Sequence, residues 1–375
     1  MTYNLTHRPN WPLNLNLKTY IPMYNLNYLE LFILNTIVYF DLFDYPLTLS
    51  EIYTYLFTGG MEGGSFTLYE IEDCLAKSEK LKKFITTQGG FYFFKNSPSP
   101  LPTLKLPPSQ MLRRTGRQAG KATANKGREE IIQIRQARYN LADKKFKIAM
   151  RAVKIFKYLP FLKMVSVCNR LAYSNAKADS DIDLFIITSP GRIWVTRLFL
   201  IAIIWLLGLR PNKGKATDKI CLSYYITTEN LNLSSTRILD IDVHLIFWLS
   251  TFWKIYERDN YFAEFYQANS WLKKYLPNWQ QPQYGLRRLV EDNNFNKTIY
   301  KILEFIEQGL IGAYFDSLAK KLQLKYMSQQ KKDLAVVGDQ SVIISDTILK
   351  FHLNDRRRQY LDMFEKKRQS IIDKI

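Results

Sequence analysis

The chain has 375 residues, of which 47% are hydrophobic and 23% are charged. This is the composition of a globular protein, long enough for two or three domains with substantial cores. The formal net charge of +19 favours an anionic partner such as nucleic acid, a nucleotide or an acidic membrane surface. A basic, solvated surface without a specific partner is the alternative.

Cysteine and histidine are sparse and scattered along the chain, which argues against a disulfide framework and against a zinc site. The residues concerned are Cys74, Cys168, Cys221, His7, His244 and His352. Residues 1–11 lack the basic segment and apolar core of a signal peptide. We therefore expect a protein of the reducing cytoplasm.

The sequence of the first 96 residues predicts an arm followed by a small module. Residues 1–27 are rich in Asn and Pro and are expected to form a loose arm. In residues 28–96, apolar spacing predicts a helix over Leu29–Phe40, and a Gly-Gly turn within Phe84–Phe94 predicts a hairpin. Two capping boxes between them begin a second and a third helix. The boxes are Thr48 with Glu51 and Thr67 with Glu70.

Three helices followed by a hairpin resemble a winged-helix module, which binds nucleic acid through its third helix. The third helix here begins with Glu70, Glu72 and Asp73, which would repel phosphates. A module for protein docking, or a spacer, is the alternative and has equal weight.

Residues 97–140 are expected to form a linker that is partly disordered. The segment Met111–Arg128 within it is basic, contains no acid and has few large apolar groups, which is typical of a disordered or solvated segment. Helical spacing begins at about Glu130, and Pro160 ends that helix.

The candidate functional residues lie in Met164–Thr188. Val165–Cys168 predicts a short strand, and Asp181–Ile187 predicts a second one. Because residues i and i+2 share one face of a strand, Asp181 and Asp183 are expected to project together. Two adjacent carboxylates repel each other unless a cation neutralises them, and Mg²⁺ favours one or two carboxylates together with phosphate oxygens.

The most apolar stretch of the chain is Ile193–Leu209. Arg197 interrupts it, and the uninterrupted run is well short of the roughly 20 residues that span a bilayer. We therefore expect a buried helix and no stable membrane insertion. A membrane-surface helix is the alternative, because Trp194 and Trp205 suit an interface, and burial of both would exclude it.

Lys219–Thr227 predicts a further strand, so that residues 141–237 form an α/β domain with a mixed sheet. Residues 238–375 are expected to be a mainly helical, aromatic C-terminal region. Its last helix carries the charged run Arg356–Arg368, which is typical of a solvated face.

The segment from Met164 to Thr227 resembles the nucleotidyltransferases of the DNA polymerase beta superfamily. Their motif begins with a hydrophobic residue, then Gly, then either Ser or Gly. After a gap of about ten residues it continues as Asp-hydrophobic-Asp-hydrophobic. Cys168-Asn169-Arg170 stands at the first part of this motif and Asp181-Ile-Asp-Leu at the second. The stretch Ala172–Asp183 is similar to bacterial proteins with this domain, some of which also carry an N-terminal winged helix.

The resemblance implies a mixed-sheet nucleotidyltransferase domain in residues 141–237. It implies that Asp181 and Asp183 are catalytic and hold one Mg²⁺ ion or two, and that Asn169, Arg170 and Ser180 contact a nucleoside triphosphate. The implied reaction is the in-line transfer of a nucleoside monophosphate to an acceptor, with pyrophosphate leaving.

The sequence departs from this motif in two ways. Asn169 replaces Gly, and Asn can adopt the left-handed backbone that Gly would supply. Arg170 replaces a small hydroxyl residue, and it either pairs with phosphate or fills the nucleotide pocket.

The superfamily also has a third carboxylate on a later strand, and Lys219–Thr227 contains no acid between its ends. The candidates are Asp218, Glu229, Asp240 and Asp242, the last two of which are expected to be helical. A catalytically degenerate protein that binds nucleotide or RNA on the same fold is therefore the alternative function. A carboxylate within reach of both aspartates would favour the enzyme.

Overall fold

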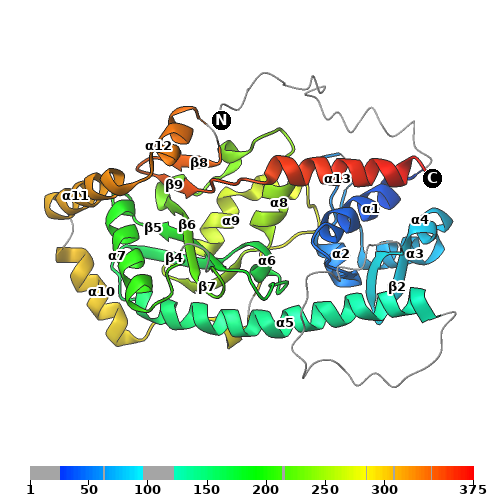
Figure 1. Ribbon diagram of the computed structural model, residues 1–375, viewed down its shortest axis with the longest axis horizontal. Coiled ribbons are helices and arrows are strands. Elements are labelled where there is room, and N and C mark those ends of the chain that lie inside the picture. Colours follow the sequence, from blue (N-terminus) through cyan, green and yellow to red (C-terminus); the bar gives the residue numbers. More distant parts are fainter. Residues whose placement is uncertain are drawn as a thin grey trace.

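The structure is a computed structural model that describes residues 26–61, 64–95, 122–212, 216–283, 285–306, 309–338 and 340–375. Most of the expected arm, residues 1–27, lies outside these ranges. The described chain is of mixed α/β class and has two sheets, one of them mixed. The N-terminal module lies at one end of the molecule and the larger sheet lies nearer the other end (Figure 1).

The N-terminal module contains four helices and a small antiparallel sheet in the order β1-β3-β2. Its elements are α1 (Tyr28–Asp41), β1 (Leu47–Thr48), α2 (Leu49–Thr54), α3 (Leu68–Lys77), α4 (Glu79–Phe84), β2 (Ile85–Gln88) and β3 (Phe91–Phe94). Both predicted capping boxes are confirmed at the starts of α2 and α3. The hairpin is also confirmed, and Gly89 and Gly90 have the positive φ values that its turn requires.

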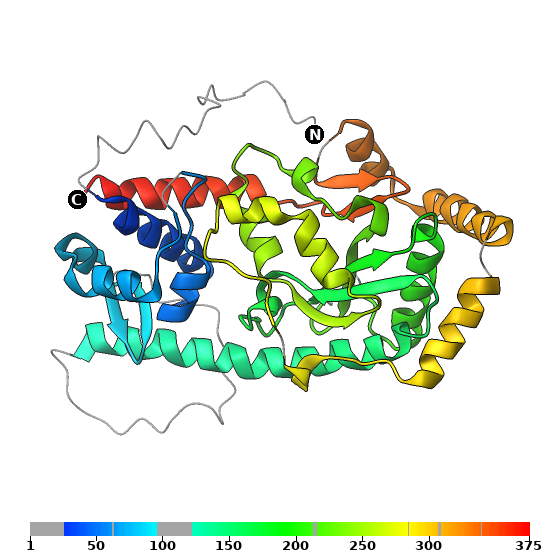
Figure 2. The same cartoon turned by 180° about the vertical axis from the view of Figure 1, so that it is seen from behind.

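Helix α5 (Ala122–Phe156) is 35 residues long and connects the module to the larger sheet (Figures 1 and 2). The linker expected over residues 97–140 is therefore wrong for its second part, which is helical from residue 122. The reason is tertiary packing: Ile134 and Arg138 of this part are buried, and so are Phe146 and Val153 further along the helix. Of the segment expected to be disordered, residues 111–121 lie outside the described residues.

The larger sheet has six strands in the order β7-β4-β5-β6-β9-β8. Strands β5 and β6 are parallel, and all other neighbours are antiparallel. The strands are β4 (Leu162–Val167), β5 (Ile182–Thr188), β6 (Ile220–Thr227), β7 (Trp253–Glu257), β8 (Val342–Ile344) and β9 (Ile348–Phe351). The strands predicted around residues 165, 183 and 223 are thus confirmed as β4, β5 and β6.

Three of these strands correct the expectation that residues 238–375 are a separate helical region. β7, β8 and β9 come from that region and complete the sheet on both sides of the β4–β6 core. Each has only three to five residues, and an apolar run this short cannot be distinguished from a piece of buried helix by its periodicity.

Helices cover both faces of this sheet. α5 and α7 (Ile193–Leu206) share a hydrophobic core with one face, whereas α8 (Val243–Ser250) and α9 (Tyr261–Ala268) share a core with the other. The predicted helix at Ile193 is confirmed as packed on the sheet. The remaining helices are α6 (Asn169–Ala172), α10 (Asn294–Ile306), α11 (Leu310–Tyr326), α12 (Gln329–Val336) and α13 (Arg357–Ile372). Among the described residues, no helix has the length and apolar character needed to cross a bilayer.

The C-terminal helix α13 is not the solvated helix expected from its charges. It packs against α1 and α8 and runs along the side of the molecule opposite α5 (Figures 1 and 2). Arg357, Phe364, Arg368 and Ile371 of this helix are buried, because α13 joins the hydrophobic core that the N-terminal module shares with α8 and α9.

Candidate functional site

Asp181 and Asp183 converge at the start of β5, as predicted. Asp181 is the residue just before the strand, and Asp183 is its second residue. Asp183 lies opposite Cys221 of β6 in the parallel register. One ligand atom from each of Asp181, Asp183 and Cys221 lies within 4.8 Å of the others. The three side chains therefore form a compact cluster, hereafter the acidic cluster.

Two negative charges in the acidic cluster are unfavourable unless other groups compensate them. Burial, and then the charge of Asp181, raise the pKa of Asp183 to about 6. Burial also raises the pKa of Asp181. The Asn169 side-chain amide donates a 2.7 Å hydrogen bond to an Asp183 carboxylate oxygen, and this bond acts against the shift. A bound cation would remove the remaining penalty.

The donor set fits a hard divalent cation. Two carboxylates are the ligands that Mg²⁺ uses beside phosphate oxygens and water. Burial and the charge of Asp183 raise the pKa of Cys221 well above its usual range, so that its thiol stays protonated and hydrogen-bonds with Asp183. Asp181 and Asp183 could therefore hold the ion, with Cys221 as a neutral neighbour.

Asn169 occupies the left-handed backbone region at the start of α6, with φ of 58°. This is the conformation that the sequence predicted for the position where the motif has Gly. It turns the chain so that the Asn169 amide reaches Asp183. Ser180 is half-buried and, together with Asp181 and Asp183, lines a cavity at the start of β5. Its carbonyl accepts a 2.6 Å hydrogen bond from the Lys145 ammonium.

Arg170 connects the motif to the N-terminal module. Its guanidinium donates a 2.5 Å hydrogen bond to the Phe43 carbonyl and lies 3.9 Å from the Asp44 carboxylate. Arg138 and Asn175 donate to the same carbonyl. The loop after α1 is therefore held against α6, which lies between the sheet and the module (Figure 1).

No third carboxylate joins the acidic cluster among the described residues. Asp218 forms a 2.6 Å ion pair with Lys145, and Glu229 is exposed in the turn after β6. Asp242 is not helical as expected: it is the N-cap of α8 and forms a buried ion pair with Arg357, while Asp240 lies before that cap. Cys221 holds the position that faces Asp183 on the neighbouring strand.

The acidic cluster opens into a cavity of about 610 Å³ that also has basic lining residues. These are Lys331 of α12, Lys350 of β9, His352 just after β9, and Arg356 and Arg357 at the start of α13. None of them was predicted from the sequence as a site residue. The alternation in Ile348-Leu-Lys-Phe-His-Leu353, with polar residues at i and i+2, is the signal that predicts a strand with one polar face.

Some of the basic residues that line the cavity form ion pairs among the described residues, and others do not. Lys350 and Arg357 are both paired with Asp355 at 2.9 Å. The half-buried Lys331 ammonium lies 5.3 Å from the centre of the Phe351 ring, and within the described chain it has no ion pair. Arg356 is exposed at the mouth of the cavity. Lys331 and Arg356 are therefore the cations available to an anionic ligand.

Aromatic residues from three elements line another side of the cavity. Tyr39 of α1 hydrogen-bonds with His244 of α8 at 2.9 Å, and the His244 ring centre lies 4.8 Å from that of Tyr360 on α13. Burial lowers the pKa of His244 and of His352 to about 4, so that both rings are neutral at pH 7. The N-terminal module thus supplies part of the cavity lining.

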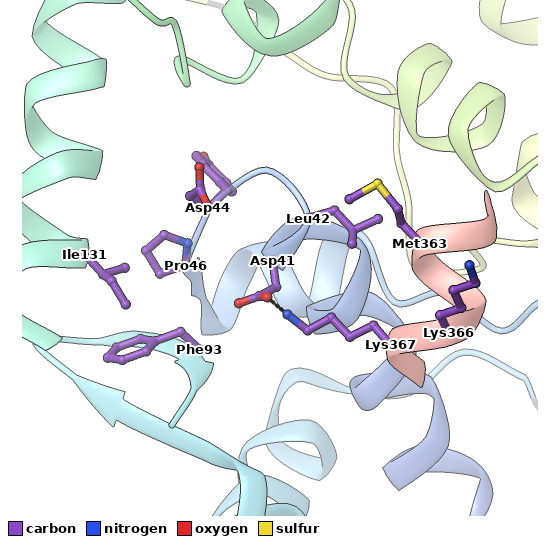
Figure 3. A pocket seen from close by; sticks show the side chains of 10 residues that line it. Asp41, Leu42, Asp44, Pro46, Phe93, Ile131, Met363, Lys366 and Lys367 are labelled. Atoms are coloured by element: carbon purple, nitrogen blue, oxygen red, sulfur yellow. Dashed lines mark hydrogen bonds and ion pairs between the residues drawn. The ribbon is translucent and has the colours of Figure 1, made fainter. Parts of the chain in front are cut away.

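A second cavity, of about 500 Å³, lies between the end of α1, β3, α5 and α13 (Figure 3). Its lining is largely apolar, and Asp41 forms an ion pair with Lys367 across it. No possible metal-binding cluster was found there among the described residues. The cavity beside Asp181 and Asp183 is therefore the candidate functional site.

Comparison of the chain with protein-family models, with curated proteins and with solved structures finds no match.

Proposed function

We propose that the protein is a nucleotidyltransferase, which transfers a nucleoside monophosphate from a nucleoside triphosphate to an acceptor with the help of Mg²⁺. The observation that carries the proposal is the acidic cluster. Asp181 and Asp183 converge at the start of a central strand and open into a cavity whose lining includes Lys331 and Arg356, for which the described residues provide no ion-pair partner. Carboxylates for a metal and cations for phosphates are the two requirements of this reaction.

The arrangement of the elements supports the corresponding fold as part of the same proposal. α5, β4, α6, β5, α7 and β6 follow one another in the chain, with both aspartates at the head of the middle strand. The strand order β4-β5-β6 combines one antiparallel and one parallel pair, as in the mixed sheet that the motif implies. Helices α1, α2 and α3, together with the short α4 and the small sheet β1-β3-β2, support a winged-helix-like module.

In this mechanism, each group around the cavity has a separate task. Asp181 and Asp183 would hold the ion, which when bound neutralises phosphate charge and favours in-line displacement. Asn169 orients the Asp183 carboxylate through its hydrogen bond. Lys331 and Arg356 would bind the outer phosphates of the triphosphate, and the aromatic rings around Tyr39 and Tyr360 offer an apolar wall for a base.

The direct test is incubation of the protein with each labelled nucleoside triphosphate and Mg²⁺, with pyrophosphate release measured for RNA, protein and small-molecule acceptors. Calorimetric titration of the triphosphate with Mg²⁺ measures binding separately. Lys331→Gln should weaken this binding by roughly tenfold or more, because it removes a charge-assisted phosphate contact. Lys332→Gln, one residue away and outside the cavity lining, is the matched control. If no triphosphate binds to the parent protein, the proposal is wrong.

The catalytically degenerate protein that binds nucleotide or RNA is the second candidate, and one observation favours it. Cys221 stands where a third carboxylate would complete the acidic cluster. Triphosphate binding without pyrophosphate release for any acceptor would support this candidate over the enzyme.

For the N-terminal module, the contacts favour the spacer and docking alternative over nucleic-acid binding. The exposed part of α3 carries Glu70 and Glu72, and its Lys77 is paired with Asp73 at 2.6 Å. The module also contributes Tyr39 and Phe43 to the cavity. We therefore propose that its main role is to close one side of the nucleotide site.

A further inference from the structure

Helix α11 presents large apolar side chains to the outside. They recur at the spacing of one helical face and are between 43% and 77% exposed. The residues are Ile311, Tyr314, Phe315, Leu318, Leu322 and Tyr326. In a helix that only covers the core of its own chain, such a stripe would face inward.

The inward side of α11 is instead small and polar. Gly312, Asp316, Ala319 and Gln323 are buried where α11 packs on α7. The Asp316 carboxylate accepts hydrogen bonds of 3.0 and 2.9 Å from the first turn of α7, and the Gln323 amide donates to the Trp194 carbonyl at 2.7 Å. These contacts fix the rotation of α11, so that its apolar stripe cannot turn inward without breaking them.

Neighbouring helices extend this surface. Phe295, Ile302 and Phe305 of α10 are exposed, and Trp205 at the end of α7 is 64% exposed. Figures 1 and 2 place α7, α10 and α11 together at the end of the molecule away from the N-terminal module. Trp194 is buried and Trp205 is exposed, so the structure does not show the burial of both tryptophans that would exclude a membrane-surface helix. The exposed apolar residues of α10, α11 and the end of α7 are called the end face below.

Exposed lysines outnumber acids around the end face, where Lys320 of α11 is paired with Asp346 at 2.7 Å. Lys297 and Lys301 of α10 and Lys321 and Lys325 of α11 are exposed. Of the acids described in these two helices, Asp316 is buried against α7, and Glu304 is paired with Lys163 at 3.0 Å. An anionic partner is therefore complementary to this surface. A second copy of the chain would bring the same four lysines together, and the described residues of α10 and α11 contain no exposed acid to pair with them.

We infer that the end face binds the surface of an anionic lipid bilayer. Exposed aromatic and aliphatic side chains beside lysines are the chemistry of a helix that lies in the interface plane, with its apolar side among the acyl chains and its cations at the headgroups. This inference is independent of the proposed catalytic function, because no residue of the acidic cluster takes part in it.

The test is sedimentation of the full-length protein with vesicles of phosphatidylcholine alone and with added phosphatidylserine. We expect binding to the anionic vesicles and weaker binding as salt increases. The double variant Leu318→Ser/Leu322→Ser should lower the partition coefficient by about tenfold or more. Lys321→Gln/Lys325→Gln should lower it by a similar factor at low salt.

Matched variants elsewhere on the surface are the controls. Leu68→Ser/Tyr69→Ser removes exposed apolar residues of α3, and Lys147→Gln/Lys154→Gln removes the same number of charges from exposed sites on α5. Both should bind vesicles nearly as the parent does, and all variants should keep the parent's melting temperature. Equal binding to both vesicle types, or no binding, would overturn the inference.

Two other results would overturn it in favour of a different partner. A lipid-free dimer that Leu318→Ser/Leu322→Ser dissociates, without vesicle binding by the parent, would assign the end face to a second copy. Binding to an acidic polypeptide such as polyglutamate, again without vesicle binding, would assign it to an acidic protein.

Discussion

At the scale of single residues, the important feature of the candidate site is that few neighbouring groups compensate the negative charge of Asp183. Its carboxylate accepts hydrogen bonds from the Asn169 amide and the Cys221 thiol, and Asp181 places a second carboxylate beside it. A buried carboxylate in such surroundings costs free energy in the folded protein. The cost is removed when a cation binds, so this arrangement is expected to bind a divalent cation.

Asp183→Asn should abolish nucleotidyl transfer while leaving the fold intact. An amide keeps the shape of the side chain but cannot supply the charge that holds a metal. The substitution also removes the repulsion between the two carboxylates, so the metal-free variant should be at least as stable as the parent. Activity assays and chemical denaturation without metal check the two expectations. Asp179→Asn, at an exposed position in the same loop, should change neither quantity.

Cys221→Asp should increase the affinity for Mg²⁺ by about tenfold or more, because it adds a third carboxylate to the acidic cluster. Without metal, the additional charge should lower the free energy of unfolding by roughly 1 to 3 kcal/mol. Added Mg²⁺ should restore stability in proportion to its binding. Calorimetric titration and thermal unfolding with and without Mg²⁺ measure both effects.

Cys221→Ser is the control for that experiment, since it removes the thiol without adding charge. An equal loss of stability in Cys221→Asp with and without Mg²⁺ would mean that the acidic cluster does not hold a metal. Pyrophosphate release that arises only in Cys221→Asp would identify the natural chain as the degenerate form of the enzyme.

At the scale of elements, the segment between β9 and α13 is held by a cluster of charges beside the cavity. Asp355 accepts from Lys350 at 2.9 Å and from Arg357 at 2.9 Å, and Arg357 also reaches Asp242 at the start of α8. Burial by itself would raise the pKa of Asp355, but the Arg357 hydrogen bonds and both cations lower it well below its ordinary value. The cluster ties β9, α8 and α13 together.

Asp355→Asn should lower the free energy of unfolding by about 2 kcal/mol at pH 7, because it leaves Lys350 without its carboxylate and Arg357 with only one. The folded-state pKa of Asp355 lies below the unfolded value of about 3.9. Its stabilising contribution is therefore complete above that value and is lost as the pH falls through the folded-state pKa. Asp355 also supports the charged form of Lys350, whose pKa burial lowers to about 8, so the difference between parent and variant should grow as the pH falls below 8 and should shrink again below about pH 4.

Denaturation curves at several pH values measure this difference. The Asp355 charge also raises the pKa of His244 and of His352, so the variant shifts their titration to lower pH as well. Asp362→Asn, on the exposed side of α13, is the control and should be nearly neutral at every pH. A parent–variant difference that stays the same down to pH 2 would contradict the role of Asp355.

At the scale of the whole molecule, the N-terminal module and the larger sheet share one hydrophobic core. Phe40 of α1 lies 5.3 Å, between ring centres, from Phe247 of α8, and the same cluster of buried residues extends to Phe185 of β5. Helices α5 and α13 reach both parts from opposite sides (Figure 2). The parts expected as separate domains are therefore expected to unfold together.

Chemical denaturation should give one transition, with the same midpoint by far-ultraviolet circular dichroism and by tryptophan fluorescence. Six of the seven tryptophans follow residue 190, and these six report on the sheet and its helices, whereas Trp11 lies outside the described residues. Phe40→Ala in the N-terminal module should lower the fluorescence-detected stability by roughly 3 kcal/mol. Tyr69→Ala, at an exposed site in the same module, should leave it unchanged. A fluorescence transition that Phe40→Ala does not move would mean that the two parts unfold separately.

The sequence by itself determined the local features of this protein. Capping boxes at Thr48 and Thr67, the glycine turn of the first hairpin, the strand of Asp181 and Asp183, and the left-handed position of Asn169 all depend on residues within a few positions of one another. The convergence of the two aspartates followed from the two-residue period of a strand alone.

Only the tertiary structure decided which distant residues meet. Cys221 faces Asp183 because β6 pairs in parallel with β5, and Lys350 reaches the cavity because a strand of four residues joins the sheet beside β6. The stripe of α11 faces outward because Asp316 and Gln323 bond to α7. Sequence periodicity specifies that a helix or strand has an apolar side, but hydrogen bonds and packing with remote segments determine what that side contacts.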